Sequence, residues 1–93
     1  MSSTPDDRIE RIRAALEREL APESLRIDDE SAAHAGHAGA REGGHFRVHI
    51  VSSQFTGRSR LQRHQLVYGA LGPLPAQGIH ALAIDARAPE ELA

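Results

Sequence analysis

The chain has 93 residues and a formal net charge of −2, which fits one domain with a modest core and argues against charge-driven binding to nucleic acid or anionic membranes. It contains no cysteine, so on its own it forms no disulfide, offers no thiol nucleophile and builds no Cys-ligated metal site. The polar N-terminus and the absence of a long apolar run predict a cytoplasmic protein without a membrane span.

The first predicted element is an amphipathic helix of about four turns. Thr4 can cap it, Pro5 suits its first position, and Pro22 lies beyond its end. Its apolar side chains recur at helical spacing: Ile9, Ile12, Leu16 and Leu20. A brief strand is predicted next, at residues 25–27.

Residues 31–44 form a long polar segment that contains almost only Ala, Gly, Ser, His and charged residues. A segment of this length is not a tight hairpin turn, and we expect a mobile loop. The clearest strand follows at residues 45–51, where apolar and polar side chains alternate. Phe46, Val48 and Ile50 share its apolar face.

A turn at residues 52–57 leads to a second helix, which Ser59 can cap and which Gly72 ends near Leu71. We expect this helix to bury Leu61, Val67, Tyr68 and Leu71. The side chains expected to face solvent are those of Arg60, Gln62 and Arg63.

The last predicted strand spans residues 79–84, and regular alternation places His80, Leu82 and Ile84 on one face. A short helical turn can follow Pro89. The resulting order is αββαβ, an α+β fold in one domain over residues 1–93, with flexible ends at 1–5 and 90–93.

Histidine is the most prominent residue type for chemistry, with six in the chain. His34, His37 and His45 fall in or beside the long loop, and imidazole is a common ligand for borderline metals. A single histidine in a polar loop is more often only a surface residue. His34 and His37 lack the further ligand pair that a zinc finger needs.

His80 is unusual because it lies at the start of an otherwise apolar strand. It is a candidate ligand, and the alternative is a structural histidine that forms a hydrogen bond to a neighbouring turn.

A basic cluster precedes and enters the second helix: Arg58, Arg60, Arg63 and His64. It could contact nucleic-acid phosphates, or it could be only the solvated side of an amphipathic helix. The acidic run of Asp28, Asp29 and Glu30 has no oriented nucleophile or apolar pocket nearby in sequence, so we expect a protein that is not an enzyme.

Five short groups of residues occur in a characteristic order: Asp29-Glu30-Ser31 with His34, His45-Phe46, Val51-Ser52 with Phe55 and Gly57, Arg63-His64 with Val67-Tyr68, and Ile79-His80-Ala81-Leu82. Together they resemble the BolA family over residues 9–89. The resemblance implies a fold similar to the class II KH domain, with a three-stranded sheet covered by helices on one face.

The resemblance also implies a partner and a cofactor. Members of the family pair with monothiol glutaredoxins and share a [2Fe-2S] cluster held by the glutaredoxin cysteine, glutathione and histidine. His80 matches the constant ligand and His34 the second, loop-borne ligand. The chain departs from the family by adding His37 and an Ala/Gly-rich insert where many relatives have a Pro-Gly-Ser-Glu stretch.

We therefore expect His80 to be the main ligand and His34 a weaker one, which His37 can replace in part, because ordering a loop costs backbone entropy. The free chain is expected to be a monomer, with a weak homodimer as the alternative. Some bacterial relatives are transcriptional regulators, so the second function to weigh is DNA binding through residues 55–68.

Overall fold

The computed structural model describes residues 5–30 and 44–92, and the side chains from residue 8 onward within them. Its principal elements are α1 (Pro5–Leu20), β1 (Ser24–Asp29), β2 (Gly44–Val51), α2 (Arg60–Leu71) and β3 (Ile79–Arg87). Three short 3-10 helices connect or follow them: η3 (Ser53–Phe55), η4 (Leu74–Gln77) and η5 (Pro89–Leu92). Within the described ranges, no helix combines the length and apolar character that crossing a membrane requires.

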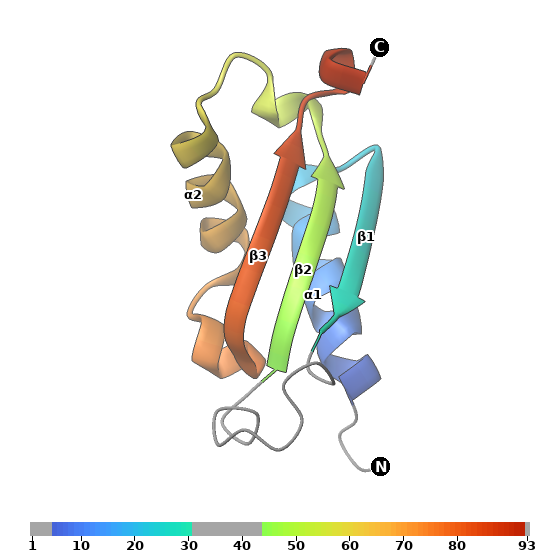
Figure 1. Ribbon diagram of the computed structural model, residues 1–93, viewed down its shortest axis with the longest axis vertical. Coiled ribbons are helices and arrows are strands. Elements are labelled where there is room, and N and C mark those ends of the chain that lie inside the picture. The colour runs from blue at the N-terminus through green and yellow to red at the C-terminus, as the bar shows by residue number, and fades with distance from the viewer. Residues whose placement is uncertain (1–4, 31–43, 93) are drawn as a thin grey trace.

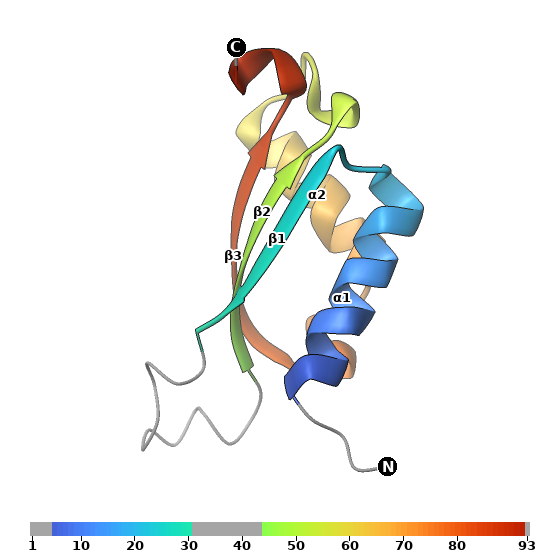
Figure 2. The same ribbon diagram turned by 90° about the vertical axis from the view of Figure 1, so that its right-hand side faces the viewer.

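The three strands form one mixed sheet in the order β1-β2-β3 (Figure 1). β1 pairs with β2 in antiparallel orientation, whereas β2 and β3 run parallel. Both long helices lie on the same face of the sheet, as the side view in Figure 2 shows. The expected α+β order αββαβ, with helices on one face of a three-stranded sheet, is confirmed.

The core lies between the sheet and the two helices, and its side chains are aliphatic apart from two phenylalanines. The predicted apolar face of β2 is confirmed, because Phe46, Val48 and Ile50 are all buried. Ser52 is buried as well, where its hydroxyl donates a hydrogen bond of 2.8 Å to the Leu20 carbonyl oxygen. This bond joins the end of α1 to the end of β2.

The second helix starts where the sequence predicts, but it buries a different face. Leu61 is 67% exposed and Tyr68 is 41% exposed, so the expectation that both are buried is wrong. The side chain of Arg63, expected to face solvent, is only 12% exposed. The buried stripe runs through positions 63, 67 and 71 at a spacing of four residues, and Arg63 occupies its first position.

Arg63 is held by the C-terminal helix η5. Its Nη1 and Nη2 atoms donate two hydrogen bonds of 2.7 Å to the Glu91 carboxylate, and Nη1 also donates to the Ala86 carbonyl oxygen. The predicted helical turn after Pro89 is confirmed. Residues 90–92 lie in this turn, where the Glu91 carboxylate accepts the hydrogen bonds from Arg63.

Gly44 begins β2 at a point where the backbone passes close to other side chains. A Cβ atom at this position would collide with the ring of Phe46 and with the Arg8 guanidinium. Arg8 can move, but the Phe46 ring is buried in the core.

We therefore expect Gly44→Ala to destabilise the fold by about 1–3 kcal/mol through overpacking. At Gly69, on the exposed side of α2, a Cβ atom would meet nothing within 4 Å apart from its chain neighbours and the backbone of its own helix. Gly69→Ala should therefore stabilise the helix by about 0.5–1 kcal/mol. Urea unfolding of the two variants measures both changes. Equal effects of the two substitutions would contradict the steric argument.

The second prediction concerns Glu91. The hydrogen bonds from Arg63, and then that from the Ala88 amide, lower the pKa of Glu91 from 4.5 to about 2. Because its folded-state pKa is depressed, ionised Glu91 stabilises the fold above the unfolded value of 4.5, and this contribution is lost as the pH falls toward about 2. Wild type should therefore be more stable than Glu91→Gln at neutral pH.

The difference in unfolding free energy between wild type and Glu91→Gln should shrink across that pH window in urea titrations. Glu17→Gln serves as the control, because Glu17 is an exposed carboxylate on α1. A difference that stays constant from neutral pH to about pH 2 would show that the Arg63–Glu91 pair does not titrate as described.

Candidate metal-ligand site at the start of the sheet

One face of the sheet carries no helix (Figure 2), and most of its side chains are polar. On β2 the alternation that buries Phe46 and Val48 places His45, Arg47 and His49 on this open face. The histidines of the central strand are therefore presented on the uncovered side of the protein.

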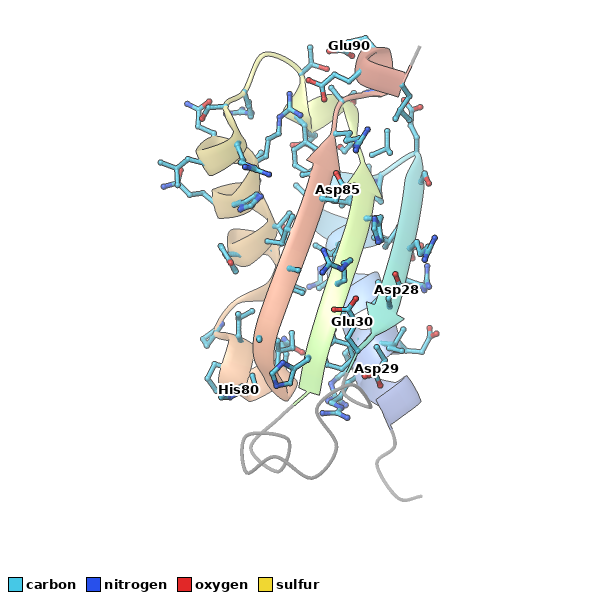
Figure 3. All side chains as sticks on the ribbon, viewed as in Figure 1. Asp28, Asp29, Glu30, His80, Asp85 and Glu90 are labelled. Atoms are coloured by element: carbon cyan, nitrogen blue, oxygen red, sulfur yellow. The ribbon has the colours of Figure 1, made fainter. Side chains whose placement is uncertain are left out.

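His80 lies at a break in the pairing of β2 with β3. Gly44 pairs with Ile79, but the next residue, His45, pairs with Ala81, so His80 is an extra residue in β3. Such an insertion changes the direction in which the neighbouring side chains point. Ile79 is buried while His80 is exposed, at the end of the sheet opposite to Asp85 and Glu90 (Figure 3).

The expectation that His80 shares a face with Leu82 and Ile84 is therefore wrong. Leu82 and Ile84 pack against the core, as regular alternation from position 82 onward requires. His80 instead lies beside His45, with 5.2 Å between the two ring centroids and 48° between the ring planes. The register shift moves the imidazole of His80 to the open face.

The other two candidate ligands, His34 and His37, lie outside the described residues. The sequence points to His45 only as one of several histidines near the loop, and the neighbour relation between His45 and His80 depends on strand pairing. No periodicity in the sequence signals a register shift, so this pair could not be found without the structure.

A small set of contacts fixes the backbone beneath the histidine pair. Gly78 precedes β3 in a left-handed conformation, with φ of 76°, which glycine adopts without strain. Its carbonyl oxygen accepts a hydrogen bond of 2.9 Å from the Gly44 amide and one of 3.1 Å from Nη1 of Arg8. The Arg8 guanidinium also lies 5.3 Å from the centroid of the Phe46 ring.

Further along the open face, His49 lies between two carboxylates. Its Nε2 is 3.3 Å from Asp28, and its Nδ1 is 3.5 Å from Asp85. Hydrogen bonds from Arg26 and Arg87 lower the pKa of Asp28 and of Asp85, respectively, and His49 adds a smaller lowering to each. These carboxyl groups stay ionised near neutral pH and are poor general acids.

The residues of the basic cluster at the second helix lie in different environments. Arg58 and Arg60 are exposed, and Nε of Arg58 donates to the Gln54 carbonyl oxygen at 2.9 Å. His64 is half-buried. The Arg63 guanidinium is hydrogen-bonded to Glu91, so it is not available to bind a phosphate group.

The donor set at the start of the sheet is two imidazoles, those of His45 and His80. Across residues 5–30 and 44–92, no group of three His, Cys, Asp or Glu side chains could hold a metal ion. A pair of imidazoles suits a borderline metal but leaves coordination positions to be filled by other ligands. The described part of the chain therefore fits a metal centre that is completed from outside it.

Comparison with known proteins agrees with this architecture. The BolA-like protein family matches residues 16–91. BolA-like protein 1 of Mus musculus is 51% identical over 80 residues, which cover 86% of this chain and 57% of that protein. The DNA-binding transcriptional regulator BolA of Haemophilus influenzae is 36% identical over 80 residues, covering 86% of this chain and 76% of the regulator.

Among solved structures, the BolA domain of SufE1 from Arabidopsis thaliana superposes with a TM-score of 0.79 at 43% identity, covering 97% of this chain and 99% of that domain. The chain thus spans little more than half the length of the mouse relative but nearly all of the plant domain. BolA-like proteins are not enzymes, which confirms that expectation. The chain belongs to the BolA-like protein family.

Proposed function

We propose that this protein is a non-enzymatic adaptor that binds a monothiol glutaredoxin, with glutathione, and shares a [2Fe-2S] cluster through His80. The glutaredoxin cysteine and glutathione would supply the thiolate ligands that this chain lacks. Iron–sulfur cluster assembly, trafficking or iron regulation is the corresponding role, in the cytoplasm.

The position of His80 is the observation that carries this proposal. The register shift at Gly44 and His45 brings the His80 imidazole out of the core and onto an exposed end of the sheet. A ligand for a shared cluster must reach a second protein, so it has to lie at the surface. A histidine that kept the regular alternation would face the helices instead.

The contacts around His80 lower the entropic cost of binding a metal through its imidazole. Buried Ile79 and the two hydrogen bonds to the Gly78 carbonyl oxygen hold the backbone before binding, so little conformational entropy remains to be lost. A neutral imidazole in place of an anionic thiolate raises the reduction potential of such a cluster. His80 would thus supply a preorganised, uncharged ligand.

Cluster reconstitution with both proteins tests the proposal. Visible absorption and circular dichroism of the mixture should differ from those of the glutaredoxin homodimer, and His80→Ala should return the spectra to the homodimer form. His64→Ala, which changes a histidine on α2 rather than on a strand, should leave the mixed spectra unchanged. Mixed-protein spectra identical to those of the homodimer would rule out a shared cluster.

A second candidate function is DNA binding through α2. Two observations favour it: the relative from Haemophilus influenzae is named as a DNA-binding regulator, and the start of the helix presents Arg58 and Arg60 to solvent beside exposed Leu61. The net charge of −2 limits the long-range attraction to DNA, so contacts would have to come from this local patch.

If α2 contacts DNA, the double variant Arg58→Ala, Arg60→Ala should weaken binding and reduce the slope of log affinity against log salt by about 2, because two phosphate contacts are lost. Mobility-shift titrations at several salt concentrations measure this slope. The matched control is Arg11→Ala with Arg18→Ala, two exposed positions on α1. No binding at low salt, or equal slopes in both double variants, would leave α2 as a solvated helix face.

A further inference from the structure

We propose that α2 carries a homodimer interface, in which two copies of this chain pack their α2 helices together in antiparallel orientation about a two-fold axis at Gln65. The interface is the outer face of α2, which consists of the exposed residues Leu61, Gln62, Gln65, Tyr68 and Gly69. Such a dimer is the alternative to the monomer that the sequence leaves open, and it requires neither a glutaredoxin nor DNA.

The outer face of α2 is uncharged, whereas the exposed side of the other long helix is rich in charge. The charged residues that are exposed on α1 are Glu10, Arg11, Glu17, Arg18 and Glu19. On α2 the outer face instead presents Leu61, 67% exposed, and Tyr68, 41% exposed. Depletion of charge and an exposed tyrosine are typical of the centre of a protein–protein interface. The composition of this face therefore favours contact with protein over contact with solvent.

Gly69 is a glycine that the single chain does not require. It lies inside α2, and it is not one of the glycines with positive φ. A Cβ atom there would meet nothing within 4 Å apart from its chain neighbours and the backbone of its own helix. Glycine destabilises a helix interior relative to alanine, but it allows another molecule to approach the helix backbone closely. Gly69 therefore marks a point where a second molecule can pack against α2.

The outer face is symmetric about Gln65, as contact with a second copy requires. Leu61 and Gly69 lie four residues before and after Gln65, which places each about 40° from it around the helix. In an antiparallel pair with the two-fold axis at Gln65, Leu61 of one copy lies level with Gly69 of the other. The large side chain can fill the space that the glycine leaves open, twice by symmetry. The two Gln65 amides can exchange hydrogen bonds across the axis.

The charges at the ends of α2 favour an antiparallel second copy. A helix dipole is positive at the N-terminal end and negative at the C-terminal end. Exposed Arg58 and Arg60 nevertheless lie at the N-terminal end, where the first turn holds no acidic residue, and the last turn holds no basic residue. In the antiparallel pair, these arginines of one copy lie beside the negative end of the other α2. A parallel pair would bring the arginines of the two copies together.

Concentration-dependent measurements on the unmodified chain test for the dimer. One helix from each copy gives an interface smaller than the roughly 1,200–2,000 Å² of stable complexes, so we expect association only at high protein concentration. Sedimentation equilibrium measures the association, and amide NMR spectra recorded on dilution locate it. The signals of Gln65, Tyr68 and Gly69 should shift while those of Glu17 and Arg18 stay in place. A monomer at every concentration, or shifts confined to other elements, would overturn the proposal.

Gln65→Glu and Gln65→Lys test the two-fold axis. Each variant places two like charges at the axis, so self-association should weaken by about tenfold or more. An equimolar mixture of the two variants places opposite charges there and should associate at least as strongly as wild type. Gln65 is exposed, and Glu and Lys are good helix formers, so both variants should fold.

The control for this charge exchange is Glu17→Lys, which changes an exposed charge on α1 and should associate like wild type. Wild-type association of either single variant at Gln65, or no recovery in their mixture, would contradict an axis at this residue and overturn the proposal.

Gly69→Leu and Leu61→Ala test the contact between the large and the small residue. Gly69→Leu places two leucines where one fits, and Leu61→Ala leaves the space at Gly69 unfilled, so each variant alone should associate more weakly than wild type. In a mixed dimer, one contact is the original one, and in the other the leucine comes from the opposite helix. Association should therefore recover in the mixture. If both variants are folded by circular dichroism and their mixture stays monomeric, the proposed pairing is wrong.

Discussion

The arrangement of the candidate site depends on one irregular step in the pairing of β2 with β3. Ile79 has to enter the core and Leu82 has to pack against it, yet three positions separate them, which regular alternation would place on opposite faces. Because His80 is an extra residue in the pairing, the side chains of Ile79 and Leu82 can both face the core. Burial of apolar side chains on both sides of the step therefore holds a polar imidazole at the surface.

Alternation along the strands divides the sheet into two chemically different faces. The helix-covered face is apolar, and the hydrophobic effect holds it together. The open face carries His45, His49 and ionised side chains, including Asp28 and Asp85 on either side of His49. Exposed ion pairs on this face, such as Arg26–Asp28 and Arg87–Asp85, contribute little to stability. Their charges oppose nonspecific apolar association of the open face.

Much of the fold could be predicted from the sequence because its signals are local. The cap at Ser59 and the alternation of β2 each depend on residues close together in the chain. The sequence-based predictions were wrong where the placement of a side chain depends on residues that are distant in the sequence. Arg63 occupies the inner stripe of α2 because Glu91, 28 residues later, reaches it, and the exposure of Leu61 follows from that same rotation of the helix.

The same reasoning applies to the candidate site. His80 could be singled out from its unusual place in an apolar strand, but its contact with His45 is set by pairing between strands that are far apart in sequence. The location then bears on the chemistry. A ligand pair inside the core could bind only a metal that the chain encloses by itself, whereas a pair at the end of an uncovered sheet face can be reached by thiolates of another protein. A chain without cysteine that presents imidazoles at an open edge of the sheet offers nitrogen donors and no thiolate to a metal.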